Sequence, residues 1–234
     1  MSVEADDGTH HRVTNDQGQR LSRVPQIPLE ATDAIERLST VLRLLATFQS
    51  IRSLADYQHH SPIPEEWFSV RLSNKNKPFE NVSSGRLELF HGDSLRYTVS
   101  NRTDNHTAHV HMLSLNASWT VGTLIWHVHL PPRQHRTGDF TLVVPRKVND
   151  DDPPEAEDTI VVIFCIGEQC SERLLSSSEW LRSVYIPPVL LVPGMETTDI
   201  PVWPFFVPPP NWCVKRITIR TVQRPQSPGP GGGA

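Results

Sequence analysis

The sequence predicts a mainly β protein, an antiparallel β-sandwich with an N-terminal amphipathic helix and disordered termini. From Trp67 onward, apolar and polar residues alternate in short runs that are separated by clusters of Gly, Pro, Asn or Asp. Such alternation is typical of half-buried strands. The predicted division is a disordered arm over residues 1–28, the helix over 29–60, the sandwich over 61–223 with a Pro-rich insert over 186–210, and a disordered tail over 224–234.

The helix follows a polar segment. Residues 1–28 are rich in Gln, Asp and His and have no periodicity, so we expect them to be disordered. Helical spacing then begins, with apolar residues at Ile35, Leu38, Leu42, Leu45, Phe48 and Ile51. This spacing predicts an amphipathic helix that Asp33 can cap and that "HHSPIP", residues 59–64, ends.

The apolar stripe of this helix is wider than one contact needs. Val41 and Leu44 lie beside Leu42 and Leu45, and together these residues cover nearly half of the circumference. We expect one part of the stripe to pack on the sandwich. Because an exposed apolar patch of this size marks an interface, we expect Val41 and Leu44 to bind a protein partner or a second copy of the chain.

The alternating runs give the strands. In order they cover residues 67–72, 86–90, 95–101, 109–115, 122–130, 140–144, 159–165 and 216–222. From the alternation we expect Tyr97, Val99, Val110 and Trp119 to share one core.

The insert over residues 186–210 is apolar and aromatic but dense in proline, so it cannot pair as a central strand. We expect it either to cover the sheet or to dock on a protein that binds polyproline helices. On either interpretation the aromatic side chains Trp203, Phe205 and Phe206 are candidates for a contact surface.

Composition excludes several classes of function. The net charge is -4 and no run is rich in Lys or Arg, so we expect no nucleic-acid binding. The sequence contains no stretch of 18 apolar residues, so we predict no membrane span. The polar start of the chain does not resemble a signal peptide, so we expect a cytoplasmic protein whose cysteines Cys165, Cys170 and Cys213 are reduced. We expect no cofactor.

Part of the chain resembles a known family. Gly92-Asp93 opens a strand, a polar turn follows, Leu115 and Trp119 form a Leu-x-x-x-Trp pattern, and "NWCVKRITIRTV" ends the region. These features are similar to the β-rich accessory region that follows the peptidase domain in fungal caspase-like (metacaspase-related) proteins. The resemblance covers roughly residues 35–222 and departs from the pattern in the Pro-rich insert. It implies a non-enzymatic domain that binds another protein, without the peptidase domain.

A cysteine peptidase is the first alternative. His91 follows one apolar run and Cys165 ends another, which is the layout of a Cys-His dyad. The acid that precedes the cysteine in caspase-like sequences is missing here. Only strands and turns are predicted between the two residues, whereas the peptidase fold is α/β. We therefore expect no catalytic residue, with His91 in a turn and Cys165 as a small core residue.

A metal-binding sandwich is the second alternative. His109 and His111 fall on one face of a strand, as do His127 and His129. If the two strands are neighbours in register, four imidazoles can bind zinc. No Asp or Glu occupies a matching position to orient the rings. The simpler interpretation is therefore an outward sheet face covered with polar side chains.

Overall fold

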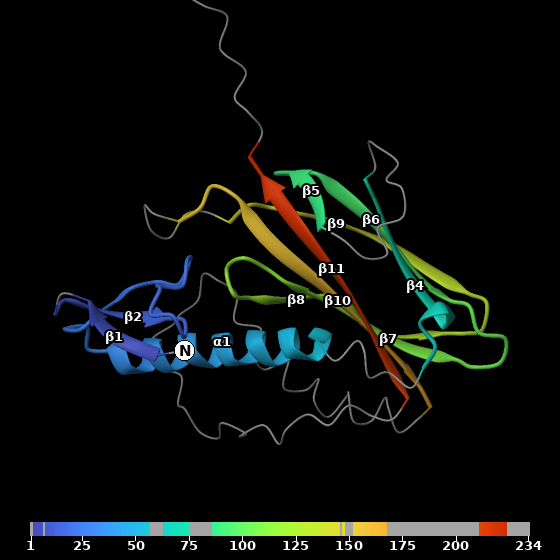
Figure 1. The fold of residues 1–234 in the computed structure, drawn as a ribbon, viewed down its shortest axis with the longest axis horizontal. Coiled ribbons are helices and arrows are strands. Elements are labelled where there is room, and N and C mark those ends of the chain that lie inside the picture. Colours follow the sequence, from blue (N-terminus) through green and yellow to red (C-terminus); the bar gives the residue numbers. More distant parts are fainter. Residues whose placement is uncertain are drawn as a thin grey trace, which may run out of the picture.

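The computed structural model describes residues 2–6, 8–56, 63–74, 86–145, 147, 152–167 and 211–223. In these residues strands predominate (Figure 1). The elements are β1 (Ser2–Asp6), β2 (His10–Thr14), β3 (Ile27–Pro28), α1 (Ala34–Asp56), the 3-10 turn η2 (Glu65–Trp67), β4 (Phe68–Asn74), β5 (Arg86–Phe90), β6 (Ser94–Asn101), β7 (Ala108–Leu115), β8 (Val121–Leu130), β9 (His135–Thr141), β10 (Ala156–Ile166) and β11 (Trp212–Val222).

Two sheets form a β-sandwich. One has the strand order β4-β6-β9 and the other β5-β11-β10-β7-β8. Alternate residues of both sheets face a shared core, including Val99 of β6, Val110 of β7 and Ile160 of β10, none of which is exposed. Phe68 stacks on Phe164 with ring centroids 4.6 Å apart. Burial of each such side chain stabilises the fold by about 1.5–3 kcal/mol.

The predicted sandwich is therefore confirmed, with two differences in detail. β5 pairs with β11 in parallel, whereas all other strand pairs among the described residues are antiparallel. The strand predicted over residues 140–144 lies earlier, as β9, because it pairs with β6 from Ser100–His135 to Ser94–Thr141.

The N-terminal residues are not a disordered arm. β1 and β2 form an antiparallel pair, and β3 adds a short third strand. A small cluster of apolar side chains lies beneath them, and Val13, Val24 and Ile27 are the members that this segment contributes with the least exposure. Only a few apolar residues of this segment form the cluster. The polar composition of the segment therefore did not indicate that it folds.

Arg23 fastens this segment to the sandwich. Its side chain donates hydrogen bonds to the carbonyl oxygens of Pro145, Pro153 and Glu155, at 2.7–2.8 Å. Its backbone N–H donates to a carboxylate oxygen of Asp152 at 2.7 Å. The residue is 3% exposed and adopts a left-handed φ of 59°. Four hydrogen bonds thus hold a conformation that non-glycine residues adopt rarely.

Helix α1 touches two surfaces, as expected, but both belong to this chain. Val41 and Leu45 pack with the N-terminal cluster, whereas Phe48 and Ile51 pack on the outer face of the five-stranded sheet. Figure 1 shows the helix beneath that sheet, with β1 and β2 beside its first turns. Val41 is 8% exposed and Leu44 is half-buried. The prediction that Val41 faces a partner is wrong, because the N-terminal cluster covers it.

Two further residues differ from the sequence prediction. Ile35 is 84% exposed, because the buried stripe runs through Ala34, Val41 and Leu45 and Ile35 lies one position to its side. Trp119 does not join the core of Tyr97, Val99 and Val110. It lies in the turn between β7 and β8, edge-on to Phe48, and its Nε1 donates to the carbonyl oxygen of Ser22 at 2.8 Å.

Some predictions concern residues that the structure does not describe. The insert over residues 186–210 with Trp203, Phe205 and Phe206, the tail over 224–234 and Cys170 lie outside the described residues. Among the described helices, none combines the length and the apolar character needed to cross a membrane.

Candidate metal centre

Strands β7 and β8 bring four histidines together on one face of the five-stranded sheet. The strands pair antiparallel, and His109 is the direct partner of His129. Ala108, Val110 and Met112 of β7 point into the core between the sheets. Because side chains alternate along a strand, His109 and His111 point to the outer face.

A β-bulge in β8 places His127, together with Trp126, opposite His111. Val110 pairs with Val128 and Met112 pairs with Ile125, so His111 alone faces two residues of β8, Trp126 and His127. The His127 ring consequently stacks on both histidines of β7. Its centroid lies 5.2 Å from that of His109 and 5.2 Å from that of His111, with interplanar angles of 5° and 18°. Bulges often redirect side chains in this way beside functional sites.

Three of the four imidazoles converge closely enough to share one ion. His109 Nδ1 and His127 Nε2 are 3.0 Å apart, and ligand atoms of His109, His127 and His129 all lie within 4.8 Å of one another. Zinc bonds of 2.0–2.1 Å at tetrahedral angles require nitrogens about 3.3 Å apart. The close pair therefore needs to separate by only about 0.3 Å. The described part of the chain contains no second group of this kind.

Burial favours the neutral imidazoles that a metal requires. It lowers the pKa of His111 to about 4, with further contributions from the neighbouring His127 and His109. Burial and then His129 lower the pKa of His127 as well. A metal binds the deprotonated ring nitrogen, so these shifts keep ligand atoms available at neutral pH.

His111 has an unusual feature. It is 5% exposed, and its Nε2 is buried with no hydrogen-bond partner. Such an atom destabilises a fold by about 1–3 kcal/mol. This unpartnered nitrogen lies beside the three converging imidazoles, since His111 stacks on His127.

The sequence pattern therefore indicated all four histidines. It also indicated the condition for a shared site, which is that their two strands are neighbours in register. β7 and β8 are neighbours, as that condition requires. His109 and His111 lie on the outward face of the sheet, as the simpler interpretation has it, but they are buried there, at 8% and 5% exposed. His127 is half-buried and His129 is exposed, so solvent reaches the group from the β8 side.

The Cys165–His91 dyad is not formed. Cys165 pairs with Trp212 at the start of β11, whereas the His91 backbone N–H donates to Val222 at the end of that strand. These two positions are ten residues apart along β11, which corresponds to about 33 Å. Nδ1 of His91 instead accepts the N–H of Val144 at 3.1 Å. The turn at His91 connects the two sheets, since β5 and β6 belong to different ones.

One of the two described cysteines differs from the sequence prediction. Cys165 is disulfide-bonded and fully buried, so it is not a reduced thiol. Cys213 is a reduced thiol in the core between the sheets. A sulfur held in a disulfide is not a thiolate nucleophile, which is a second argument against the dyad.

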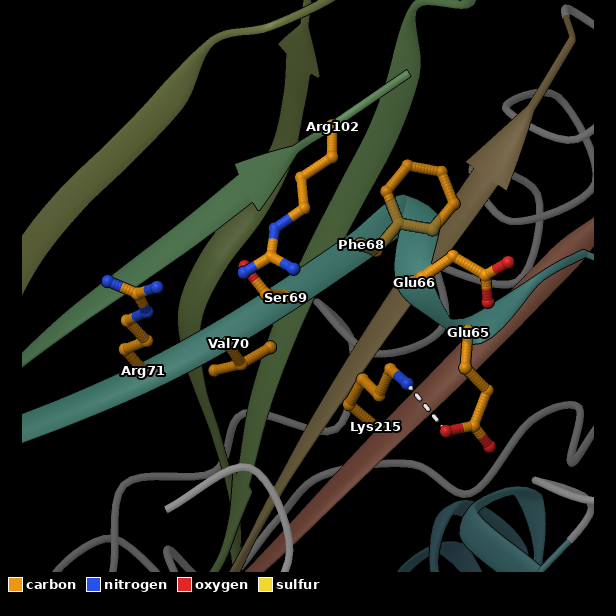
Figure 2. Close-up of a pocket in the computed structure, with 8 residues that line it drawn as sticks. All are labelled: Glu65, Glu66, Phe68, Ser69, Val70, Arg71, Arg102 and Lys215. Atoms are coloured by element: carbon orange, nitrogen blue, oxygen red, sulfur yellow. Dashed lines mark hydrogen bonds and ion pairs between the residues drawn. The ribbon is translucent and has the colours of Figure 1, made fainter. Parts of the chain in front are cut away.

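A cavity of about 410 Å³ lies beside β4, on the other sheet. Figure 2 shows its lining, which consists of Glu65, Glu66, Phe68, Ser69, Val70, Arg71, Arg102 and Lys215. Lys215 Nζ pairs with a Glu65 carboxylate oxygen at 3.1 Å. The side chains of Arg71 and Arg102 are exposed at the rim. Charges of both signs occur here without converging on one point, so the histidine group is the better candidate site.

Comparison with known proteins gives little further information. No protein-family model and no curated protein matches this chain. Among solved structures, a CARDB domain from Pyrococcus furiosus, determined in complex with di-metal ions, is similar over 67% of this chain and 94% of that chain, at 9% sequence identity and a TM-score of 0.26. At this TM-score, the likeness says nothing about the function of this chain.

Proposed function

We propose that this chain is a metal-binding β-sandwich whose ion is held by His109, His127 and His129. The observation that carries the proposal is the convergence of their ligand atoms within 4.8 Å, which a register and a bulge of β7 and β8 together produce. Three neutral imidazoles leave the charge of a divalent ion uncompensated and a tetrahedral position open. Such an ion can bind water or a small anion on the solvent-facing side of β8.

The ligand chemistry selects the class of metal. Imidazole nitrogen suits zinc, copper and nickel, whereas magnesium and calcium require oxygen ligands. The triad contains no carboxylate. We therefore expect the chain to bind zinc and copper and to bind neither magnesium nor calcium.

Zinc titration of the purified full chain tests the proposal. We expect one ion per chain by calorimetry, and we expect that ion to remain after desalting when metal content is measured. His129→Ala should reduce the affinity by about 100-fold, because it removes one of three ligands. His129 is exposed, so this change should leave the fold intact.

His135→Ala is the matched control. His135 is an exposed histidine at the start of β9 in the other sheet. Its loss should change neither stoichiometry nor affinity. Equal weakening by both substitutions would indicate scattered surface binding and would contradict a defined site.

The interaction-domain hypothesis from the family resemblance remains a separate proposal. It depended partly on an uncovered stripe of α1, and Val41 in that stripe is covered within the chain. Self-association is tested by sedimentation at high micromolar concentration, with Leu44→Glu as the variant. If the unaltered chain and Leu44→Glu are both strict monomers, self-association is contradicted.

A further inference from the structure

The cavity beside β4 runs along a free strand edge. Among the described strands, β4 pairs with β6 alone and is therefore an edge strand of the three-stranded sheet. The four consecutive residues from Phe68 to Arg71 all line the cavity. Successive side chains of a strand point to opposite faces, so a cavity that all four residues line lies along their shared backbone edge. Its volume of about 410 Å³ is that of an ordinary ligand-binding pocket.

The register shows which backbone groups face the cavity. The Arg102 N–H donates to the Trp67 carbonyl oxygen at 2.8 Å, which continues the register of β4 and β6 by one residue. In an antiparallel pair, residues that exchange hydrogen bonds with the partner strand alternate with residues that point away from it. Every second residue from Trp67 onward therefore bonds to β6. Val70 and Leu72 fall between these positions, so they direct their backbone N–H and C=O groups to the free edge.

The other wall of the cavity lies where pairing in the second sheet also ends. It contains Lys215 of β11. β5 pairs with β11 only from Thr218 to Val222, so at Lys215 the strand β11 has no described neighbour on the β5 side. The cavity thus occupies a place where hydrogen bonding between described strands stops in both sheets.

The charges around the cavity favour an acidic occupant. Figure 2 shows the guanidinium groups of Arg71 and Arg102 to the left of the carboxylates of Glu65 and Glu66. Lys215 neutralises Glu65. The side chains of Arg71 and Arg102 form no ion pair with any described residue. Two cations therefore stand against one remaining carboxylate, and the arginine side of the cavity attracts an anionic group.

We propose that an extended segment of a partner protein pairs with β4 in this cavity and places an acidic side chain beside Arg71 and Arg102. The segment becomes a fourth strand of the sheet and bonds to the edge-facing backbone groups of Val70 and Leu72. Directly opposite residues of two strands share a face of the sheet. Val70 faces the core, so the partner residue opposite it is apolar, whereas the residue opposite Arg71 is acidic. The inference is independent of the metal site, which is on the other sheet.

Amide hydrogen exchange of the full chain, followed by NMR, tests the pairing. The probe is a blocked seven-residue peptide in which valine alternates with threonine and glutamate replaces the central threonine. Without peptide, we expect the Val70 and Leu72 amides to exchange faster than the Ser69 amide, which bonds to β6. At a peptide concentration ten times the Kd, exchange at Val70 and Leu72 should slow about tenfold, because only the unbound protein exchanges. Exchange at Ser69 should not change.

Charge substitutions test the acidic character of the partner. A peptide with glutamine in place of glutamate should bind about tenfold more weakly, and a peptide with lysine more weakly still. Arg71→Gln and Arg102→Gln should each weaken binding of the glutamate peptide about threefold and leave the glutamine peptide unaffected. Arg136→Gln is the matched control, since Arg136 is an exposed arginine of β9 in the same sheet and does not line the cavity. This change should leave the affinity for all peptides unaltered.

Backbone methylation of the peptide tests strand addition separately from charge. One form carries methyl groups on two valine nitrogens and the other on the two threonine nitrogens. Only one of these two sets of N–H groups faces β4 in a paired strand. One methylated peptide should therefore lose binding while the other retains it.

Four results would overturn the proposal. Val70 and Leu72 amides that are already protected without peptide would mean that the chain itself or a second copy fills the position. The other three are no slowing with any peptide, equal affinities for the glutamate, glutamine and lysine peptides, and equal affinities for the two methylated peptides. Zinc affinity of Arg71→Gln and Arg102→Gln should equal that of the unaltered chain, so none of these results affects the metal-binding proposal.

Discussion

The two ends of the outer face of the five-stranded sheet are buried to a similar extent but differ in chemistry. At one end Leu113 and Leu115, which are 4% and 0% exposed, pack in the same cluster as Phe48 of helix α1. At the other end of the same strand, His109 and His111 are 8% and 5% exposed. We call the first of these the helix end and the second the histidine end. At the helix end, apolar contacts with α1 cover the sheet. The histidine end contains nitrogen atoms that such contacts cannot satisfy, so burial there adds less stability than burial beside α1.

Truncation at the helix end should have the largest effect on stability. Leu115→Ala removes a fully buried side chain between β10 and α1, and we expect it to lower the free energy of unfolding by about 2–5 kcal/mol. Urea denaturation measures the loss. Zinc affinity of the folded protein should stay unchanged, because the triad lies at the other end. A loss below about 1 kcal/mol would show that the two ends are not energetically distinct.

Asp158, near the helix end, should make stability depend on pH. Burial raises the pKa of Asp158 to about 6, although the Ala117 N–H and Arg23 partly oppose the shift. The native state therefore holds this proton more tightly than the unfolded state. That stabilisation is complete below about pH 4 and is lost as the pH rises through about 6.

Asp158→Asn should consequently raise the free energy of unfolding by about 2–3 kcal/mol at pH 8 and by almost nothing at pH 3.5. Its amide oxygen can still accept the Ala117 N–H, which the carboxylate accepts at 3.0 Å. Glu66→Gln is the control, because Glu66 is an exposed carboxylate in η2 and is not among the groups that shift the pKa of Asp158. Equal gains for Asp158→Asn at both pH values would refute the assigned cause.

The smallest effect is expected at the histidine end. His111→Leu replaces an unpaired buried nitrogen by apolar atoms, so we expect stability to stay the same or rise by about 1 kcal/mol. Thermal unfolding without metal measures the change. Zinc binding should persist, since the triad is intact. A loss as large as that of Leu115→Ala would mean that His111 contributes through packing rather than as a polar group.

Local pattern was enough to predict most of the sandwich. Alternation located the strands around Val99 and Val110, because these strands have one face in the core and one outside it. It also put His109 and His111 on one side of their strand. Helical spacing located α1 by the same kind of signal. These features depend on neighbours within a few residues, which a sequence shows directly.

Features that depend on distant residues were missed. The bulge at Trp126 and His127 depends on how β8 pairs with β7, and no residue of β8 indicates it in the sequence. The N-terminal sheet was missed because Val13 stands among polar residues and Ile27 lies between two prolines, and their burial depends on contacts with α1. For the same reason the second surface of α1 was assigned to a partner instead of to the chain itself.

The contacts of Arg23 also have a consequence for the order of folding. Asp152, which accepts its backbone N–H, lies 129 positions later in the chain. At a synthesis rate of about 5–20 residues per second, roughly 10 s pass between the synthesis of the first strands and α1 and the synthesis of Asp152. During that interval Phe48 and Ile51 of α1 have no complete five-stranded sheet to pack against. The part of the molecule that is made first thus gains its anchor only after strands β4 to β9 have been made.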